Sequence, residues 1–150
     1  MAIKYKPKKG QVLICNFQEA KSKRNSQAIQ RPGGRVGGQK QDLRGFVPPE
    51  MIKPRPVIVL SNKSNDLCVV VPLSTTKPYK ILTWHHRVSG LNLPHPYDDD
   101  VSWAKCDHIH TVCYERLSGL NYGNRQYKNI FLDDTDFQAV YKCVLEVIKL

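Results

Sequence analysis

The clearest pattern in the chain is an apolar run, Val57-Ile58-Val59-Leu60, which follows the basic and proline-rich stretch 53–56. Four apolar residues in a row, three of them β-branched, predict a buried strand. A second such run, Leu67 to Pro72, follows after the polar segment 61–66. Turn residues between two strand-like runs are typical of a hairpin, so we expect these two strands to pair.

Further strands are predicted on either side of this hairpin. Residues 11–17 form a compact apolar run after Gly10, and residues 78–84 form another before two histidines. From Val101 to Val112 the chain alternates as a strand does. One face of that strand would hold Trp103, Lys105, Asp107 and Ile109, and the other Ala104, Cys106, His108 and His110. A last short strand is expected at residues 129–132.

The C-terminal segment predicts one amphipathic helix. Asp133 is the expected N-cap, and Asp134 and Asp136 place negative charge in the first turn, where the helix dipole favours it. Apolar residues then recur at helical spacing, namely Phe137, Val140, Tyr141, Val144, Leu145 and Ile148. This one-sided repeat predicts a helix packed on the sheet. The expected fold is mainly β, a strongly bent antiparallel sheet or half-open barrel with a C-terminal helix, in a single domain of residues 1–150.

Residues 18–48 interrupt this pattern after the first strand. Within them, residues 21–44 carry seven basic side chains, one acidic side chain and two Gly-Gly pairs, with almost nothing to bury. We expect a long, basic, glycine-rich insertion that follows a nucleic-acid backbone, with Arg31 and Arg35 among its RNA contacts. The alternative is a solvated loop without a ligand.

The whole composition is strongly basic. With 23 Lys and Arg against 13 Asp and Glu, the 150 residues carry a formal net charge of +10. This balance favours nucleic acid (RNA or DNA) over a membrane, since no apolar run approaches the ~20 residues that span a bilayer. The N-terminus lacks a secretory signal, and the five cysteines form an odd set without CxxC spacing. Both features predict a cytoplasmic protein with free thiols.

Arg55 is the first candidate functional residue, because prolines on both sides hold it extended at the start of the predicted strand. A guanidinium held in this way has little freedom left to lose, and its planar fork suits a phosphate. The alternative is an ordinary surface arginine. Three hydroxyls, those of Ser74, Thr75 and Thr76, follow the second strand of the hairpin, so pairing would bring them near Arg55.

Two other kinds of site compete with this one. Cys106, His108, His110 and Cys113 lie within eight residues of each other, but the first three share one face of a predicted strand. Zinc ligands normally converge from turns or separate elements, so we expect neither a metal nor another cofactor. Histidine acid–base chemistry has candidates in His85, His86, His108 and His110, none of which is paired in sequence with a second catalytic group.

The order of these signals resembles the PemK/MazF toxins, the ribonuclease components of type II toxin–antitoxin systems. The resemblance rests on the block from Arg55 to Ser61, the block from Val71 to Thr75, the triplet Lys105-Cys106-Asp107 and the C-terminal helix. It covers residues 8–150 apart from the insertion. It implies an SH3-like barrel of the CcdB/PemK kind, a homodimer, metal-independent cleavage of single-stranded RNA (mRNA), and inhibition by an acidic antitoxin.

The same resemblance assigns roles to residues. Arg55 matches the family's catalytic arginine, Ser74 stands where the family usually has a phosphate-contacting threonine, and Thr75 is its neighbour. Glu50 stands at the family's acidic position, and Lys105 with Asp107 matches an Arg and Asp pair. The expected catalytic residues are Arg55, Ser74, Thr75 and Glu50, and the expected RNA-binding residues are Lys53, Lys105, Asp107, His108, Arg31 and Arg35.

The residue types suit cleavage in which the ribose 2′-OH attacks the neighbouring phosphate. Arg55 would stabilise charge on the transition state, and Ser74 or Thr75 would hold a non-bridging oxygen. Glu50 or Asp107 would accept the proton, with Glu50 preferred. Two other functions stay open: a non-catalytic nucleic-acid-binding barrel, which the charge alone supports, and a CcdB-like toxin that acts by protein contact. The latter needs neither the hydroxyl cluster nor the positive charge.

Overall fold

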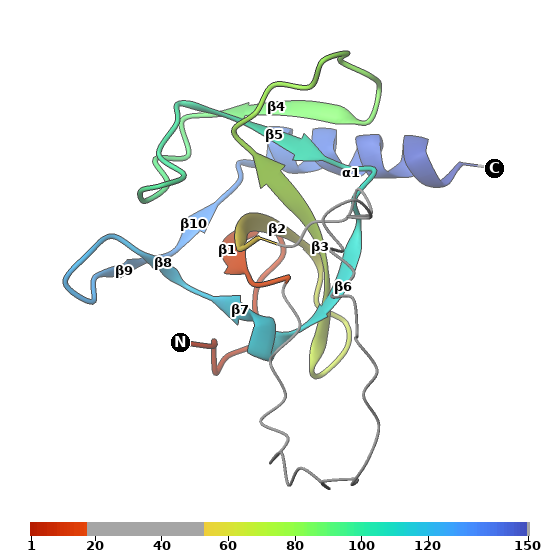
Figure 1. Cartoon of the computed structure of the whole chain (residues 1–150). Helices are drawn as coiled ribbons and strands as arrows, with labels where there is room; N and C mark the ends of the chain where they lie inside the picture. The colour runs from red at the N-terminus through yellow and green to blue at the C-terminus, as the bar shows by residue number, and fades with distance from the viewer. Residues whose placement is uncertain (18–52, 150) are drawn as a thin grey trace, which may run out of the picture.

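The computed structural model describes residues 1–17 and 53–149 of the chain (Figure 1). Its strands are β1 (Gln11–Cys15), β2 (Arg55–Ser61), β3 (Leu67–Ser74), β4 (His85–Ser89), β5 (Val101–Lys105), β6 (His110–Cys113), β7 (Leu117–Ser118), β8 (Leu120–Asn121), β9 (Tyr127–Lys128) and β10 (Ile130–Phe131). A short 3-10 turn, Tyr114–Arg116, precedes β7, and helix α1 spans Asp134–Ile148.

Most of these strands form one antiparallel sheet in the order β10-β1-β2-β3-β5-β4. The predicted hairpin is its centre, with β2 and β3 paired from Val57 opposite Pro72 onward. The other edge of β3 is shared, because β6 pairs with residues 67–70 and β5 with residues 73–74. At the far side, β7 and β10 both pair with β1. The sheet therefore curls, and the predicted bent, half-open architecture with one C-terminal helix is confirmed (Figure 1).

Between its two end residues, the central strand β2 is apolar at every position from Pro56 to Leu60, because both of its faces are buried there. Val57 and Val59 pack in one cluster with residues of β1, β3 and β7. Ile58 and Leu60 pack in a second cluster that includes Val140 of helix α1. A strand covered on both faces loses the usual alternation of polar and apolar residues. This placement explains the continuous run from which the sequence predicted a buried strand.

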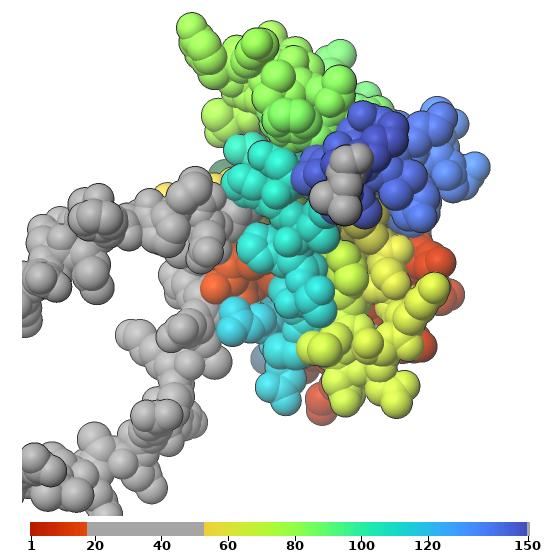
Figure 2. All heavy atoms as spheres, turned by 90° about the vertical axis from the view of Figure 1, so that its right-hand side faces the viewer, coloured from red at the N-terminus to blue at the C-terminus, as the bar shows by residue number. Residues whose placement is uncertain are grey.

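Helix α1 begins as predicted, but only part of its apolar stripe is covered. The Asp133 carboxylate accepts a hydrogen bond from the backbone N–H of Asp136 at 2.7 Å, which caps the first turn. Val140 and Val144 are buried, whereas Tyr141, Leu145 and Ile148 are exposed. The prediction that the whole stripe packs on the sheet is therefore wrong for these three residues. The helix lies on the outer surface of the molecule in Figure 2.

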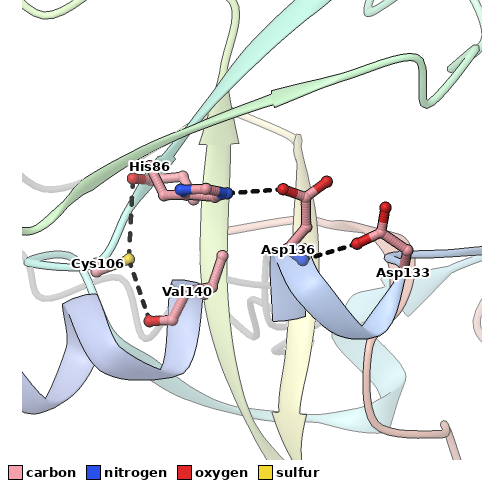
Figure 3. A network of polar contacts seen from close by, with 6 residues as sticks. His86, Cys106, Asp133, Asp136 and Val140 are labelled. Atoms are coloured by element: carbon pink, nitrogen blue, oxygen red, sulfur yellow. Dashed lines mark hydrogen bonds and ion pairs between the residues drawn. The ribbon is translucent and has the colours of Figure 1, made fainter. Parts of the chain in front are cut away.

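A polar link joins the start of α1 to the edge strand β4. His86 Nε2 lies 2.8 Å from Asp136 Oδ1, and Asp136 is itself the residue whose N–H is capped by Asp133 (Figure 3). The Cys106 thiol lies beside the same helix, 3.7 Å from the Val140 carbonyl oxygen. Together these contacts fix the helix against the β4–β5 side of the sheet.

Two strand predictions need correction. Residues 78–84 form no strand, and β4 begins only at His85. Pro78 lacks a backbone donor, and Tyr79 and Ile81 are exposed, so this segment has neither the hydrogen bonds nor the burial of a strand.

The predicted strand 101–112 is divided in two. Continuing the register of β5 would place Asp107 opposite Val70, but the partner of Val70 is His110. The chain therefore has three more residues here than a continuous strand would need, and they form a turn after Lys105. Strands β5 and β6 on either side of this turn follow the bent edge of β3. The alternation of faces predicted beyond Lys105 does not hold.

The five cysteines are free, and no helix in the described ranges is long and apolar enough to cross a membrane. Burial raises the pKa of the Cys15 thiol to about 12 and that of Cys68 to about 11. It also raises the pKa of Cys106 far above its usual range. These three thiols stay protonated at neutral pH, so they serve as apolar packing groups rather than nucleophiles.

Candidate active site

A pocket of about 170 Å³ lies where β2 begins and β3 ends. One wall is formed by residues 53–56, which include Arg55 and both of its flanking prolines. The rest of the lining is formed by Leu73, Thr75, Pro96, Tyr97 and Ser102. Residues from β2, the end of β3, the loop 90–100 and β5 therefore meet at one place.

Arg55 is half-buried at the first position of β2, where it pairs with Cys15 of β1. Its Nε atom is buried and has no hydrogen-bond partner within residues 1–17 and 53–149. A buried guanidinium nitrogen without a partner is costly in a folded protein, because it has given up water without replacing its hydrogen bond. Such a group suits an anionic ligand that is absent from the free protein.

The two candidate hydroxyls differ sharply in their surroundings. Ser74 is 3% exposed, and its Oγ accepts a hydrogen bond from the backbone N–H of Thr76 at 3.2 Å. Thr75 is exposed and lines the pocket that Arg55 also lines. The Ser74 hydroxyl thus closes the turn that follows β3, and this turn presents the Thr75 side chain at the pocket.

Two polar residues of the pocket were not singled out from the sequence. Tyr97 lines the pocket, and its hydroxyl donates a hydrogen bond to the Pro54 carbonyl oxygen at 2.9 Å. This contact ties the loop 90–100 to the residue that precedes Arg55. Ser102 is a buried hydroxyl on β5 in the same lining. Neither residue could be found from local sequence. The partner of Tyr97 lies 43 residues away, and Ser102 is brought to the pocket by the pairing of β5 with other strands.

The proposed RNA-binding residues fall into three groups. Lys53 lies in the wall of the Arg55 pocket. Lys105 is the last residue of β5, roughly 10 Å from Ser102 along that strand at the usual rise per residue, and Asp107 and His108 lie in the turn that follows it. Asp107 Oδ2 and His108 Nε2 are 3.7 Å apart, a loose pair at the surface. Arg31 and Arg35 lie outside the described residues, as does Glu50, which was expected to be catalytic.

None of the candidate histidines lines the Arg55 pocket. His86 is bound to Asp136, and His85 Nδ1 accepts a hydrogen bond from the Leu82 N–H at 3.1 Å. The Cys/His group is also dispersed, because Cys106 is buried against helix α1 while His110 lies in β6. Within the part of the chain that the structure describes, no three His, Cys, Asp or Glu side chains are grouped so as to hold a metal ion.

Comparison with known proteins places this geometry in a family context. A family model described as "PemK-like, MazF-like toxin of type II toxin-antitoxin system" matches residues 40–148. The Escherichia coli (strain K12) protein YifN is 37% identical to the chain over 123 residues, which cover 79% of this chain and 76% of YifN. An uncharacterized protein of Haemophilus influenzae is 27% identical over 125 residues, which cover 78% of this chain and 73% of that protein.

Solved structures agree on the fold. An endoribonuclease in complex with its cognate antitoxin from a mycobacterial species superposes with a TM-score of 0.52 at 14% identity, over 95% of this chain and 94% of that chain. The Mycobacterium tuberculosis toxin MazF-mt6 superposes with a TM-score of 0.50 at 20% identity, over 67% of this chain and 92% of that one. The family model extends over most of the sequence, including the Arg55 block, the hydroxyl turn and helix α1, and the chain therefore belongs to the PemK-like, MazF-like toxins of type II toxin–antitoxin systems.

Proposed function

We propose that the chain is an endoribonuclease that cleaves single-stranded RNA without a metal ion. The observation that carries this proposal is the pocket shared by Arg55 and Thr75, in which the buried Arg55 Nε has no partner among the described residues. A phosphate oxygen supplies the acceptor that this nitrogen lacks. The family resemblance supports the same activity.

In the proposed reaction, the ribose 2′-oxygen attacks the adjacent phosphorus and the bond from phosphorus to the 5′-oxygen breaks. The products carry a 2′,3′-cyclic phosphate and a 5′-OH. Arg55 stabilises the negative charge that develops on the phosphorane-like transition state, as a fixed cationic donor does in a site shielded from water. Its position between Pro54 and Pro56, with Tyr97 bound to the Pro54 carbonyl, supports this pre-organised role.

We assign the phosphate-contacting hydroxyl to Thr75. The sequence favoured Ser74 because of its position in the family pattern, but Ser74 is buried and its oxygen already accepts the Thr76 N–H. Thr75 is exposed at the pocket wall.

The other roles are proposed as follows. Glu50 is our proposed proton acceptor, with Asp107 as the second candidate. The residues proposed to contact the RNA backbone are Lys53, Lys105, His108, Arg31 and Arg35.

Metal independence has its own support. The described part of the chain offers no cluster of three metal-binding side chains, and the pocket wall carries cations rather than carboxylates. The proposed partners are an acidic antitoxin, to which the +10 charge is complementary, and a second copy of this chain. The five free thiols support a reducing, cytoplasmic location.

The proposal is tested with purified protein, single-stranded RNA and excess EDTA. We expect cleavage that persists in EDTA and leaves 2′,3′-cyclic phosphate ends, which mass spectrometry of the fragments identifies. Activity that disappears with EDTA and returns with magnesium or zinc would show a metal-dependent enzyme instead. RNA that is bound but never cut would favour the non-catalytic binding barrel.

A further inference from the structure

A second and larger cavity, of about 600 Å³, lies between the N-terminal segment and the β8–β9 hairpin. Residues 1–5 form one wall, with Ile3 N–H bound to the Leu117 carbonyl oxygen at 2.9 Å. Gly119, Tyr127 and Lys128 contribute to the other wall. In Figure 1 the N-terminus and β8–β9 lie together on the opposite side of the molecule from the C-terminal end of α1. The proposed catalytic pocket does not include any of these residues.

Two tyrosines give this cavity flat apolar surfaces. Tyr127 is 55% exposed although its ring lies against the backbone of Gly119, where a Cβ atom would come within 3.1 Å of Tyr127 Cδ1. Tyr5 is 46% exposed and lines the same cavity. Exposed aromatic rings held against a rigid backbone suit the stacking of a flat ligand such as a nucleobase.

All charged side chains in the lining are positive. They are Lys4, Arg125 and Lys128, and no Asp or Glu is among the lining residues. Arg125 adopts a left-handed backbone conformation with φ of 59°, uncommon for a residue with a side chain, in the turn that places it at the cavity. Lys128 Nζ lies 4.7 Å from the centre of the Tyr122 ring, which holds that cation along the hairpin. The cavity therefore favours an anionic ligand.

Polar groups in the wall offer donors for a base edge. Gln11 Nε2 donates to Tyr5 Oη at 3.0 Å and to Asn129 Oδ1 at 3.3 Å. These bonds orient the two side chains and leave the tyrosine O–H and the Asn129 Nδ2 group as donors. Asparagine amides and stacked tyrosines beside cations are the groups that proteins use to bind single-stranded RNA.

We propose that this cavity binds a nucleobase of single-stranded RNA, with the neighbouring phosphates held by Arg125 and Lys128. The inference rests on the proposed function for the identity of the RNA strand. Arg55 pairs with Cys15, Cys15 pairs with Leu117, and Leu117 bonds to Ile3. The cavity therefore begins three strands from Arg55, roughly 14 Å along the sheet. A few nucleotides span this distance, so one RNA strand reaches both places.

The test is the affinity of the full chain for a fluorescent 2′-O-methyl RNA of about 12 nucleotides and mixed sequence, a length within the range of single-strand-binding domains. This RNA lacks the 2′-OH nucleophile, so binding is measured without cleavage. Tyr127→Ala should raise the Kd about 10-fold through lost stacking, and Tyr127→Phe should keep the wild-type Kd because it keeps the ring. The double variant Arg125→Gln with Lys128→Gln should make log K less steeply dependent on log salt concentration, by the amount expected for about two lost phosphate contacts. Lys63→Gln, in the remote β2–β3 turn, should leave this slope unchanged.

The outcomes separate this proposal from the proposed function. If the wild type never cuts normal RNA but Tyr127→Ala still weakens binding of the 2′-O-methyl RNA, cleavage fails and the cavity assignment stands. If Tyr127→Ala binds as tightly as wild type, the cavity assignment is overturned even when cleavage is present. If Tyr127→Ala instead loses affinity for a synthetic peptide rich in glutamate and leucine while its RNA affinity is unchanged, the cavity assignment is overturned in favour of a protein partner. A wild-type chain that binds no RNA overturns both.

Discussion

At the scale of single residues, the proposed chemistry depends on Arg55, in which one side-chain nitrogen is shielded from water and has no hydrogen-bond partner among the described residues. The Arg55 Nε is buried without a hydrogen bond in the described part of the chain, while Pro54 and Pro56 restrict the backbone on both sides. A group prepared in this way contributes most where negative charge develops during the reaction. Substrate binding as such gains less from it, since many other cations attract RNA.

Arg55→Ala should lower the single-turnover cleavage rate at saturating protein by at least about 100-fold, the scale for loss of one pre-organised donor. The Kd for 2′-O-methyl RNA should rise much less. Arg55→Lys is the matched control, because it keeps the charge but loses the planar fork, and its rate should lie between the two. A wild-type rate for Arg55→Ala would place the catalytic centre elsewhere.

The two neighbouring hydroxyls should respond differently to removal. Thr75→Ala should lower the cleavage rate about 10-fold or more with an unchanged melting temperature, because Thr75 is exposed at the pocket. Ser74→Ala should lower the free energy of unfolding by about 1 kcal/mol, because its buried oxygen accepts the Thr76 N–H. Thr75→Ser should retain activity. The reverse result, with Ser74→Ala inactive and fully stable, would give the role to Ser74.

At the scale of elements, helix α1 is held by its first turn and by two buried valines. Asp133 caps the helix, Asp136 continues to His86 on β4, and Val140 and Val144 pack on the sheet (Figure 3). The remaining apolar residues of the helix lie outside this contact. The first turn of the helix therefore contributes much of its attachment to the sheet.

Asp133→Ala should lower the free energy of unfolding by about 1 kcal/mol, the usual cost of losing an N-cap side chain. Asp134→Ala is the control, since it removes the same charge next to the cap but no hydrogen bond that the structure records. Asp134→Ala should lower the free energy of unfolding by less, because it removes only the favourable interaction with the helix dipole. Urea denaturation of the two variants measures the difference, and equal losses would show that charge rather than capping stabilises this end.

At the scale of the whole molecule, the exposed stripe on α1 is the best candidate for a contact between two copies. Tyr141, Leu145 and Ile148 recur at helical spacing on the outer surface, where the helix is visible in Figure 2. Three large apolar side chains aligned on one helix are unusual for a monomer surface. The family resemblance independently implies a homodimer.

Leu145→Glu should convert the expected dimer to a monomer, because it places a charge in the centre of the stripe. Ile81→Glu is the control, as Ile81 is 54% exposed and Leu145 is 39% exposed, but Ile81 lies in the segment between β3 and β4. Sedimentation at micromolar concentration measures both variants against the wild type. A wild-type monomer, or a dimer that survives Leu145→Glu, would remove the helix from the interface.

The sequence by itself determined the central hairpin, the capped C-terminal helix and the family, because these depend on local signals. A continuous β-branched run, a polar turn and an Asp at the N-cap act through neighbours a few residues away.

Only the tertiary structure decided the features that depend on partners remote in the sequence. The break after Lys105 follows from the change of strand pairing along β3, and the helix is covered only where Val140 and Val144 pack in the core. Tyr97 reaches the Arg55 pocket by a bond to Pro54, and the burial of Ser74 leaves Thr75 at the pocket wall. Periodicity reports which side of an element is apolar, whereas the position of a pocket is set by which elements meet there.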